Sequence, residues 1–257
     1  MNRKPQRLDV TFSITWQADW HVGSGRGTSQ VDRLLRRRAC GPRGERLPFV
    51  PGSQIKGVLR HQCERLLATL GGEVVSPHAV GAQAEPALLK QFRPLARSPL
   101  LIDRLFGSRY QGECLFVDDA VPPRDGVRLA SRLHSRTSID RVTGTAREQT
   151  LFVTEVACGR DATLHSRLQA RHAPGTLTQD DDGFPFEYAL LLAGLLSLDQ
   201  LGGDKSAGLG RCRITIAGDA VRWNDHPDYP LAQALKCFEE PEWLAMLQLL
   251  REEEKEG

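Results

Sequence analysis

The sequence predicts an α+β fold, and alternating and helical patterns along its 257 residues support that prediction. Residues 8–18 alternate apolar and polar side chains, which is typical of a half-buried strand. Residues 54–70 and 186–198 have the apolar content of helices that cover a sheet. Further strands are predicted at residues 47–50, 114–121, 150–158 and 212–216. The order strand, helix, strand, strand, helix, strand is that of a ferredoxin-like or RRM-like unit, an open antiparallel sheet with both helices on one face.

The elements follow one another with long insertions between them. The apolar face of the helix at 54–70 carries Ile55, Leu59 and Leu67, and Gly71 with Gly72 ends it. Residues 73–99 are weakly patterned and contain several prolines. The segments at 21–46, 73–104 and 122–149 are therefore expected to be insertions, and loops of this length are usually functional or disordered. Residues 231–250 predict one or two amphipathic helices.

A hydrophobic content of 40% is enough for a sizeable core, and we expect one domain over residues 1–257. Its core is expected at about 8–70, 105–121 and 150–217, with a helical tail at about 228–257. No run approaches ~18 apolar residues, so no membrane segment is expected. The start of the chain lacks the apolar region of a secretory signal. Six cysteines without a Cys-x-x-Cys pair predict free thiols in a cytoplasmic protein.

Charge is unevenly distributed, although the net charge is only +2. Residues 26–46 hold seven arginines against two acidic residues, and residues 124–147 hold six against two. The C-terminal end is acidic. Two arginine-rich segments beside glycine-containing loops favour contact with a polyanion, and arginine suits bidentate phosphate contacts and stacking on bases. A solvated basic surface is the alternative reading, but RNA is the better prediction.

A phosphate site is predicted where the strand at 47–50 runs through Pro-Gly-Ser at 51–53 into the next helix. Ser53 is suited to cap that helix. Lys56 and Arg60 lie one turn apart, and free N–H groups at a helix start attract phosphate. On capping mechanics alone, an ordinary strand-to-helix turn explains this segment equally well.

The segment at 201–211 is rich in glycine and enters the last predicted strand. Glycine permits positive φ and close approach of the backbone to a ligand, and successive N–H groups in such a loop can cradle a phosphate. The segment is not a P-loop, because Lys205 precedes Gly208 and the loop follows a helix. A tight helix-to-strand turn is the alternative for Gly202 and Gly203.

Five segments together resemble the motifs of the RAMP superfamily of CRISPR-associated proteins. They are His-Val-Gly-Ser-Gly at 21–25, Pro-Gly-Ser-Gln-Ile-Lys-Gly at 51–57, Leu-Phe-Gly-Ser at 105–108 with Gly-Glu-Cys-Leu-Phe-Val-Asp-Asp-Ala at 112–120, Ile-Asp-Arg-Val-Thr-Gly-Thr-Ala at 139–146, and Leu-Gly-Gly-Asp-Lys-Ser-Ala-Gly-Leu-Gly-Arg at 201–211. They occur in the expected order and span most of residues 8–217. The chain resembles in particular the repeated backbone subunit of type III effector complexes, which holds guide RNA and cuts target RNA.

The resemblance implies specific partners and contacts. It implies binding to guide RNA, target RNA and other copies of the chain or related RAMP subunits. It implies that the segment at about 122–149 is a thumb, an extended hairpin that displaces a base pair of the guide–target duplex. The implied RNA contacts are Arg33, Arg36, Arg37, Ser53, Lys56, Arg60, Arg136, Ile139, Arg141, Val142, Gly202, Gly203, Lys205, Gly208 and Gly210. A disordered basic loop is the alternative for the thumb.

The resemblance also implies a catalytic role for Asp32 and an acid–base or guide-contacting role for His21. Cutting subunits carry an aspartate in this loop, where it would hold Mg²⁺ or another divalent cation together with phosphate oxygens and water. The sequence departs from the family after this aspartate, because Arg-Leu-Leu at 33–35 replaces a small residue, proline and an apolar residue. A salt-bridge role for Asp32 and a structural role for His21 are the alternatives.

Three other functions fit parts of the sequence. A catalytically inactive guide-RNA-binding scaffold would share the fold and partners. A guide-processing endoribonuclease would use His21 without metal, although it would have no need of a thumb. An interaction module would use the acidic C-terminal helix on a protein partner.

Overall fold

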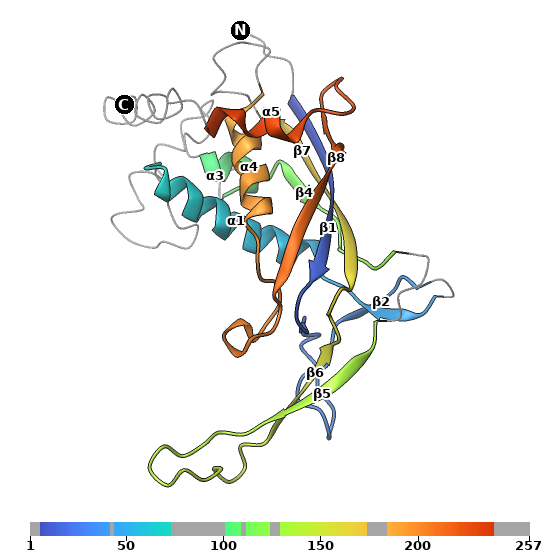
Figure 1. The fold of residues 1–257 in the computed structure, drawn as a ribbon, viewed down its shortest axis with the longest axis vertical. Helices are drawn as coiled ribbons and strands as arrows, with labels where there is room; N and C mark the ends of the chain where they lie inside the picture. The colour runs from blue at the N-terminus through green and yellow to red at the C-terminus, as the bar shows by residue number, and fades with distance from the viewer. Residues whose placement is uncertain are drawn as a thin grey trace.

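The computed structural model describes residues 6–41, 44–72, 74, 101–108, 112–123, 129–173 and 184–238. Its strands are β1 (Gln6–Trp16), β2 (Arg37–Ala39), β3 (Arg46–Pro48), β4 (Leu115–Val117), β5 (Ser131–Arg136), β6 (Phe152–Ala157), β7 (Thr163–Ala173) and β8 (Cys212–Trp223). Its helices are α1 (Gly52–Thr69), α3 (Leu101–Phe106), α4 (Phe186–Leu196), α5 (Leu231–Leu235) and the short 3₁₀ helices η1 (Lys205–Ala207) and η2 (Lys236–Phe238). The helices gather on one side of the main sheet (Figure 1).

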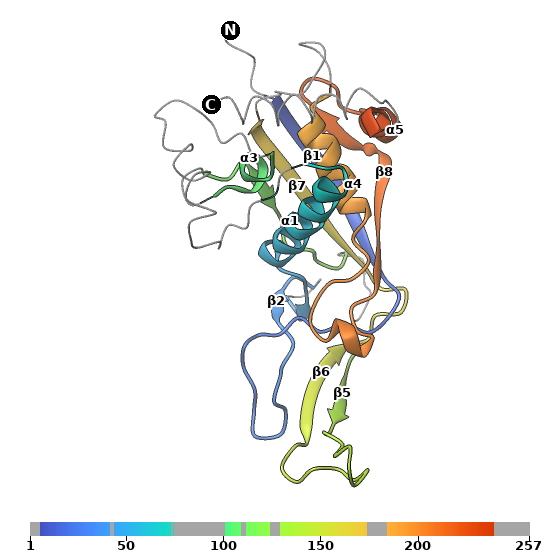
Figure 2. The ribbon, with the colours of Figure 1, turned by 90° about the vertical axis from the view of Figure 1, so that its left-hand side faces the viewer.

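The main sheet has the order β4-β7-β1-β8, and every neighbouring pair is antiparallel. The chain visits β1, α1, β4, β7, α4 and β8 in turn. This order and pairing are those of a ferredoxin-like unit, so the predicted fold class is confirmed. Figure 2 shows α1 and α4 lying across the same face of the sheet.

The core lies between that face and the two helices. Alternate residues of β1 from Leu8 to Trp16 are at most 2% exposed, as the period of two in the sequence predicts. They pack against buried side chains of α1 and α4. The two helices approach closely at Gly194, where an added Cβ would lie 2.5 Å from Sγ of Cys63. Glycine at this position therefore sets the distance between the helices.

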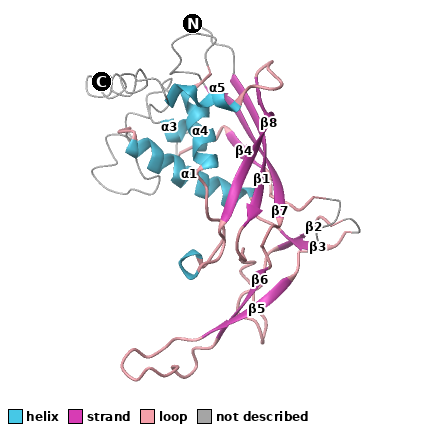
Figure 3. Cartoon of the chain, viewed as in Figure 1, coloured by secondary structure: helices cyan, strands magenta, loops and turns pink. Residues whose placement is uncertain are grey.

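The prediction for the third core strand was wrong. Residues 150–158 were expected in the main sheet, but the partner strand of β6 is β5, in a separate two-stranded sheet that projects from the core (Figure 3). The third core strand is β7, which follows it. Its inward side chains are Leu164, Ser166, Leu168 and Ala170, and its outward ones include Arg167 and Arg171. Because small residues stand between the inward leucines, the apolar alternation is weaker than in β1, and the strand is harder to find in the sequence.

The capping role expected for Ser53 was also wrong. Helix α1 begins at Gly52. Its N-cap residue is Pro51, whose side chain makes no capping hydrogen bond. Oδ1 of Asp119 accepts a hydrogen bond from the Gly52 N–H at 2.9 Å, and its other oxygen pairs with Arg38. Gly52 also fits tightly, since an added Cβ would lie 1.9 Å from the Val117 carbonyl oxygen. The strand after the insertion thus positions the start of α1.

Other expectations fall partly outside the described residues. The segment at 73–100, apart from residue 74, and the tail beyond residue 238 are not described. None of the five cysteines that the structure describes with their side chains forms a disulfide bond, in agreement with the sequence analysis. Within the described part of the chain, no helix is long and apolar enough to cross a membrane.

Replacing Asp119 with alanine should weaken the start of α1. Loss of a helix-capping acceptor costs about 1 kcal/mol of unfolding free energy. Asp119→Asn keeps an oxygen that accepts from the Gly52 N–H, so we expect it to lose clearly less stability. Urea unfolding of the two variants and the wild type measures this difference. Equal losses in both variants would mean that the ion pair with Arg38, and not the cap, is what matters.

Candidate nucleic-acid interface

Three segments distant in sequence meet beyond one end of the main sheet. They are the loop at 20–36, the β5–β6 hairpin and the glycine-rich loop at 201–211 (Figures 1 and 2). Hydrogen bonds and ion pairs join each to another. Most residues that the sequence singled out for RNA contact or catalysis lie on these segments.

The loop at 20–36 is an ordered hairpin. The Ser24 N–H donates to Leu34 O at 2.9 Å, and the Thr28 N–H donates to Val31 O at 2.7 Å. Gly27 lies so close to this turn that an added Cβ would come within 2.6 Å of the Asp32 carbonyl oxygen. Glycine is thus required where the hairpin closes, and the loop presents Asp32 in a fixed place.

Asp32 is exposed and lies against the free edge of β6. Its N–H donates to the Val153 carbonyl at 2.9 Å, and its Oδ2 accepts from the Val153 N–H at 2.7 Å. No described group donates to its Oδ1. The side chain is therefore fixed through one carboxylate oxygen while the other is available to a ligand.

Asp204 joins the three segments. Its two oxygens accept from Arg33 and Arg136, each at 3.1 Å. The guanidinium of Arg33 also lies over the ring of Phe152, 4.4 Å from its centroid. Both arginines, predicted as RNA contacts, are thus bound within the protein and keep only part of their surface for a ligand. They hold the thumb base, the Asp32 loop and the glycine-rich loop together.

Glu155 makes a second junction at the base of the hairpin. Its carboxylate accepts from the Leu35 N–H, from Ser131 and from Arg37. Partial burial alone would raise the pKa of this carboxyl, but the three donors outweigh it and lower the pKa. Arg37, predicted as an RNA contact, is therefore occupied by Glu155.

His21 lies inside the protein, at 3% exposure. Its Nδ1 lies 2.7 Å from the Glu155 carbonyl oxygen and its own carbonyl accepts from the Gly203 N–H at 2.8 Å. A hydrogen bond to a carbonyl requires a proton on Nδ1, so the neutral ring carries its acceptor on Nε2. This geometry supports the structural reading of His21, which links β6 to the glycine-rich loop.

The glycine-rich loop is closed mainly by its own backbone. The N–H groups of Gly203, Gly208 and Gly210 donate to carbonyls of the protein. An added Cβ would lie 2.6 Å from the His21 carbonyl oxygen at Gly202 and 2.0 Å from the Leu201 carbonyl oxygen at Gly210. These glycines are thus required by packing, and those three N–H groups are not available as a phosphate cradle.

Lys56 and Arg60 turn toward internal partners. Lys56 pairs with Glu113 and donates to the Leu115 carbonyl at 2.9 Å. Arg60 donates to Glu64 and Asp103 and to the Gly107 carbonyl. Their side chains are only 18% and 16% exposed. The predicted phosphate site is not open here, and either cation would have to leave its present partners to bind RNA.

The hairpin ends in a tip with exposed apolar side chains. Ile139 and Val142 are 56% and 95% exposed, and Arg141 beside them is exposed. Oδ1 of Asp140 accepts from the N–H groups of Val142 and Thr143, and these bonds lower the pKa of Asp140. The tip is thus ordered by a local turn, with its apolar residues pointing away from any core.

Several cations remain without an ion pair to any described carboxylate. On these three segments they are Arg26, Arg36, Arg141, Lys205 and Arg211. All of these except Arg26 and Arg211 were predicted as RNA contacts. Asp204 and Glu155, the two carboxylates that assemble the site, were not predicted. Asp204 lies within the glycine-rich motif, but its partners come from segments far away in the chain, so nothing local marks it.

The described residues form no ready-made metal site. Nowhere among them do three His, Cys, Asp or Glu side chains gather in a way that could hold a metal ion. Asp32 offers one unbonded oxygen. Mg²⁺ is commonly bound by one or two carboxylates plus substrate phosphates and water. Asp32 therefore fits a divalent cation only if RNA supplies most of the other ligands.

Fold and site together define a ferredoxin-like protein that presents a basic loop-and-hairpin surface. The model of the RAMP superfamily matches residues 14–213, which is most of the chain. The chain therefore belongs to the RAMP superfamily and is a CRISPR-associated RNA-binding protein. A comparison with curated proteins finds no match.

Gly210 and Gly208 give a matched test of the glycine-rich loop. Both have positive φ, but an added Cβ meets nothing within 4 Å at Gly208 and lies 2.0 Å from a carbonyl oxygen at Gly210. Gly208→Ala should cost about 1 kcal/mol of unfolding free energy for backbone strain alone. Gly210→Ala should cost about 3 kcal/mol or more, because the Leu201 backbone must move. Chemical unfolding measures both, and similar costs would show that the loop adapts freely.

Glu155→Gln tests the second junction through pH. A carboxyl with a lowered pKa stabilises the fold above its unfolded pKa, and that stabilisation is lost as the pH falls through the folded value. We expect Glu155→Gln to be less stable than wild type at neutral pH, and the gap to shrink as the pH falls below about 4.5, the ordinary glutamate value. Urea unfolding across this range measures the gap. Glu148→Gln, an exposed control, should show none, and a pH-independent gap for Glu155→Gln would contradict the assignment.

Proposed function

We propose that this RAMP protein is a backbone subunit of a type III CRISPR effector that binds guide RNA and cleaves complementary target RNA. The observation that carries the proposal is the position of Asp32. It is exposed, fixed by a backbone pair to Val153, and lies at the base of a hairpin whose tip carries exposed apolar residues. A single carboxylate beside a base-displacing hairpin suits cutting at a fixed place on each bound subunit.

RNA would lie along the cations of this surface that have no described carboxylate partner. Arg26 and Arg36 flank Asp32 on its own loop, and Lys205 lies on the neighbouring glycine-rich loop. Phosphates of an RNA strand would bind there, while Ile139 and Val142 would insert between bases. Base pairing with the guide would select the target, and the protein would contact backbone and shape.

Cleavage would begin with attack of a ribose 2′-oxygen on the adjacent phosphorus. The phosphorus–5′-oxygen bond breaks, the 2′ proton leaves to a base or water, and the departing 5′-oxygen gains a proton. Asp32 would act near this phosphate through Oδ1, with Oδ2 held by Val153. Arg36 would offset charge on the phosphorane, since Arg33 is bound to Asp204. A divalent cation bound by Asp32 and the RNA would supply further charge stabilisation.

The rival functions receive less support. A guide-processing nuclease that depends on His21 requires an accessible ring, and His21 is buried. An inactive scaffold would share every RNA contact and differ only at Asp32. The acidic C-terminal segment, on which an interaction module would depend, lies outside the described residues beyond Phe238.

Asp32→Asn tests cleavage without removing the fixed geometry. The amide oxygen still accepts from the Val153 N–H, but the negative charge is lost. In a guide-loaded complex with labelled complementary RNA and Mg²⁺, we expect the cleavage rate to fall about 100-fold or more while target binding is unchanged. Chelation with EDTA should stop the wild type.

Asp32→Ala and Asp140→Asn complete the design. Asp32→Ala also removes the bond to Val153. If its cleavage rate falls further than that of Asp32→Asn, the additional loss measures how much the ordered position of the loop contributes. Asp140→Asn removes a carboxylate from the hairpin tip and should cut normally. Full activity in Asp32→Asn would make the subunit a scaffold and assign the cutting elsewhere.

A further inference from the structure

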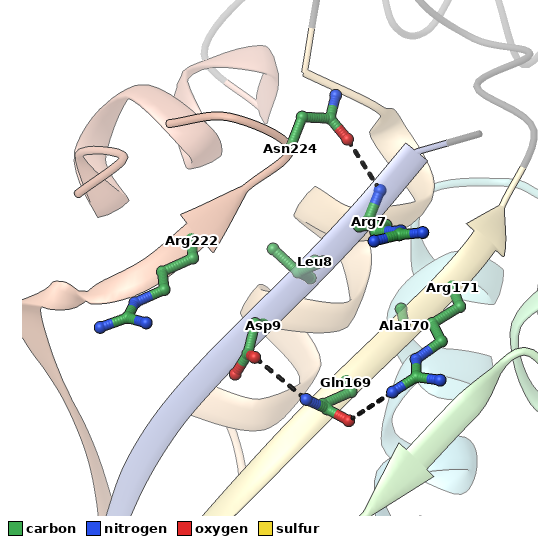
Figure 4. A pocket seen from close by; sticks show the side chains of 8 residues that line it. All are labelled: Arg7, Leu8, Asp9, Gln169, Ala170, Arg171, Arg222 and Asn224. Carbon is green, nitrogen blue, oxygen red and sulfur yellow. Dashed lines mark hydrogen bonds between the residues drawn. The ribbon is translucent and has the colours of Figure 1, made fainter. Parts of the chain in front are cut away.

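A pocket lies on the open face of the main sheet, opposite the helices. It has a volume of about 390 Å³ and is formed at the end of the sheet where β1 begins (Figure 4). The lining residues are Arg7, Leu8, Asp9, Gln169, Ala170, Arg171, Arg222 and Asn224. The candidate interface lies beyond the other end of β1, roughly 30 Å away by the rise of a strand. The pocket is therefore a separate feature.

The pocket concentrates positive charge from three adjacent strands. Arg7 of β1 lies directly opposite Arg171 of β7, and Arg222 of β8 lies opposite Asp9. Like charges directly opposite each other in an antiparallel pair are destabilising. Neither Arg7 nor Arg222 forms an ion pair with a described carboxylate. The repulsion between Arg7 and Arg171 does not stabilise the fold. An anionic ligand bound beside these arginines would offset it, so their placement points to such a ligand.

The floor of the pocket is held in place by a hydrogen-bonded network. Asp9 accepts from Arg167 and from Gln169, and the bond from Arg167 is the largest cause that lowers the pKa of Asp9. Gln169 in turn accepts from Arg171 at 3.3 Å. Asn224 accepts from the Arg7 N–H and donates to Gln6. The floor is thus fixed, and the guanidinium groups at the rim are the adaptable part.

We propose that this pocket binds a short stretch of a single RNA strand, with one phosphate at Arg7 and Arg171 and a neighbouring phosphate at Arg222, which lies on the other side of β1 (Figure 4). A ribose hydroxyl or base amino group would donate to Asp9, which accepts hydrogen bonds only. The guanidinium of Arg171 lies 5.8 Å from the ring centroid of Phe116, and this pair offers a surface on which a base can stack. An acidic peptide fits less well, since its carboxylates have no proton to donate to Asp9.

The pocket lies mostly outside the segment that the family model matches. Five of its eight lining residues lie outside the segment 14–213 that the RAMP model matches, namely Arg7, Leu8, Asp9, Arg222 and Asn224. The proposed site does not depend on cleavage at Asp32. It would give the subunit a second contact with RNA on the face turned away from the helices.

Salt-dependent binding of the full chain to a short single-stranded RNA tests the proposal, without guide complement or Mg²⁺. Each phosphate that arginines neutralise on a single strand contributes about 0.7 to the slope of log affinity against log salt. We expect Arg7→Gln/Arg222→Gln to lower the slope by about 1, because Arg171 still neutralises part of the charge of one phosphate. The control Arg65→Gln/Arg213→Gln removes two exposed arginines outside the pocket and should leave the slope unchanged. An unchanged slope in the pocket variant would overturn the proposal.

Two further measurements distinguish an RNA-strand site from a structural arginine cluster, a free-nucleotide site and a peptide site. Without RNA, Arg7→Gln should not lower the melting temperature, because it relieves repulsion from Arg171; a clear drop would make Arg7 a structural residue and overturn the site. Uridine monophosphate should bind much more weakly than the oligonucleotide. Equal affinity would mean that the pocket binds a free nucleotide and not an RNA strand. A peptide of residues 239–257 that binds wild type but not Arg7→Gln/Arg222→Gln, with the RNA slope unaffected, would assign the pocket to a protein partner.

Discussion

The candidate interface depends on the edge of β6 that does not face β5. β5 pairs with one side of β6, and the backbone groups on the other side need partners. The loop at 20–36 supplies them, with Trp20 bonded to Ala157, Arg33 to Glu155 and Asp32 to Val153. The aspartate and the thumb thus share one strand. Any movement of the hairpin relative to the core must carry Asp32 with it or break these bonds.

Two carboxylates turn this pairing into a rigid junction. Asp204 binds Arg33 and Arg136, and Glu155 binds Arg37, Ser131 and the Leu35 N–H. Both are only partly exposed, so water screens them less than it screens surface pairs. The arginine-rich sequence therefore has two physical roles. Some arginines assemble the site, and those without carboxylate partners, such as Arg36, remain available to a ligand.

The sequence predicted the fold class because β1, α1 and α4 have strong periodic patterns. It failed at β7, where Ser166 and Ala170 alternate with the inward leucines and make the apolar alternation weaker than in β1. It also failed at the start of α1, where Asp119, distant in the chain, caps the helix in place of Ser53. The inward turn of Lys56 and Arg60 has the same cause, because Glu113 and Asp103 lie more than forty residues away. Local motifs identify the charged residues but not their tertiary partners.

Because local motifs do not show tertiary partners, a motif that matches the family and a residue that is placed for RNA contact must be told apart. The glycines at 202 and 210 occur in a motif that the family uses beside RNA, yet their φ angles and close contacts are required by the fold itself. Their presence therefore says that the loop has the family's shape, not that it touches RNA. Asp32 is different, because no packing or buried ion pair requires its charge. The bond from Val153 uses only Oδ2 of Asp32, so the second, exposed oxygen, amid cations that lack carboxylate partners, is the feature that folding alone does not explain.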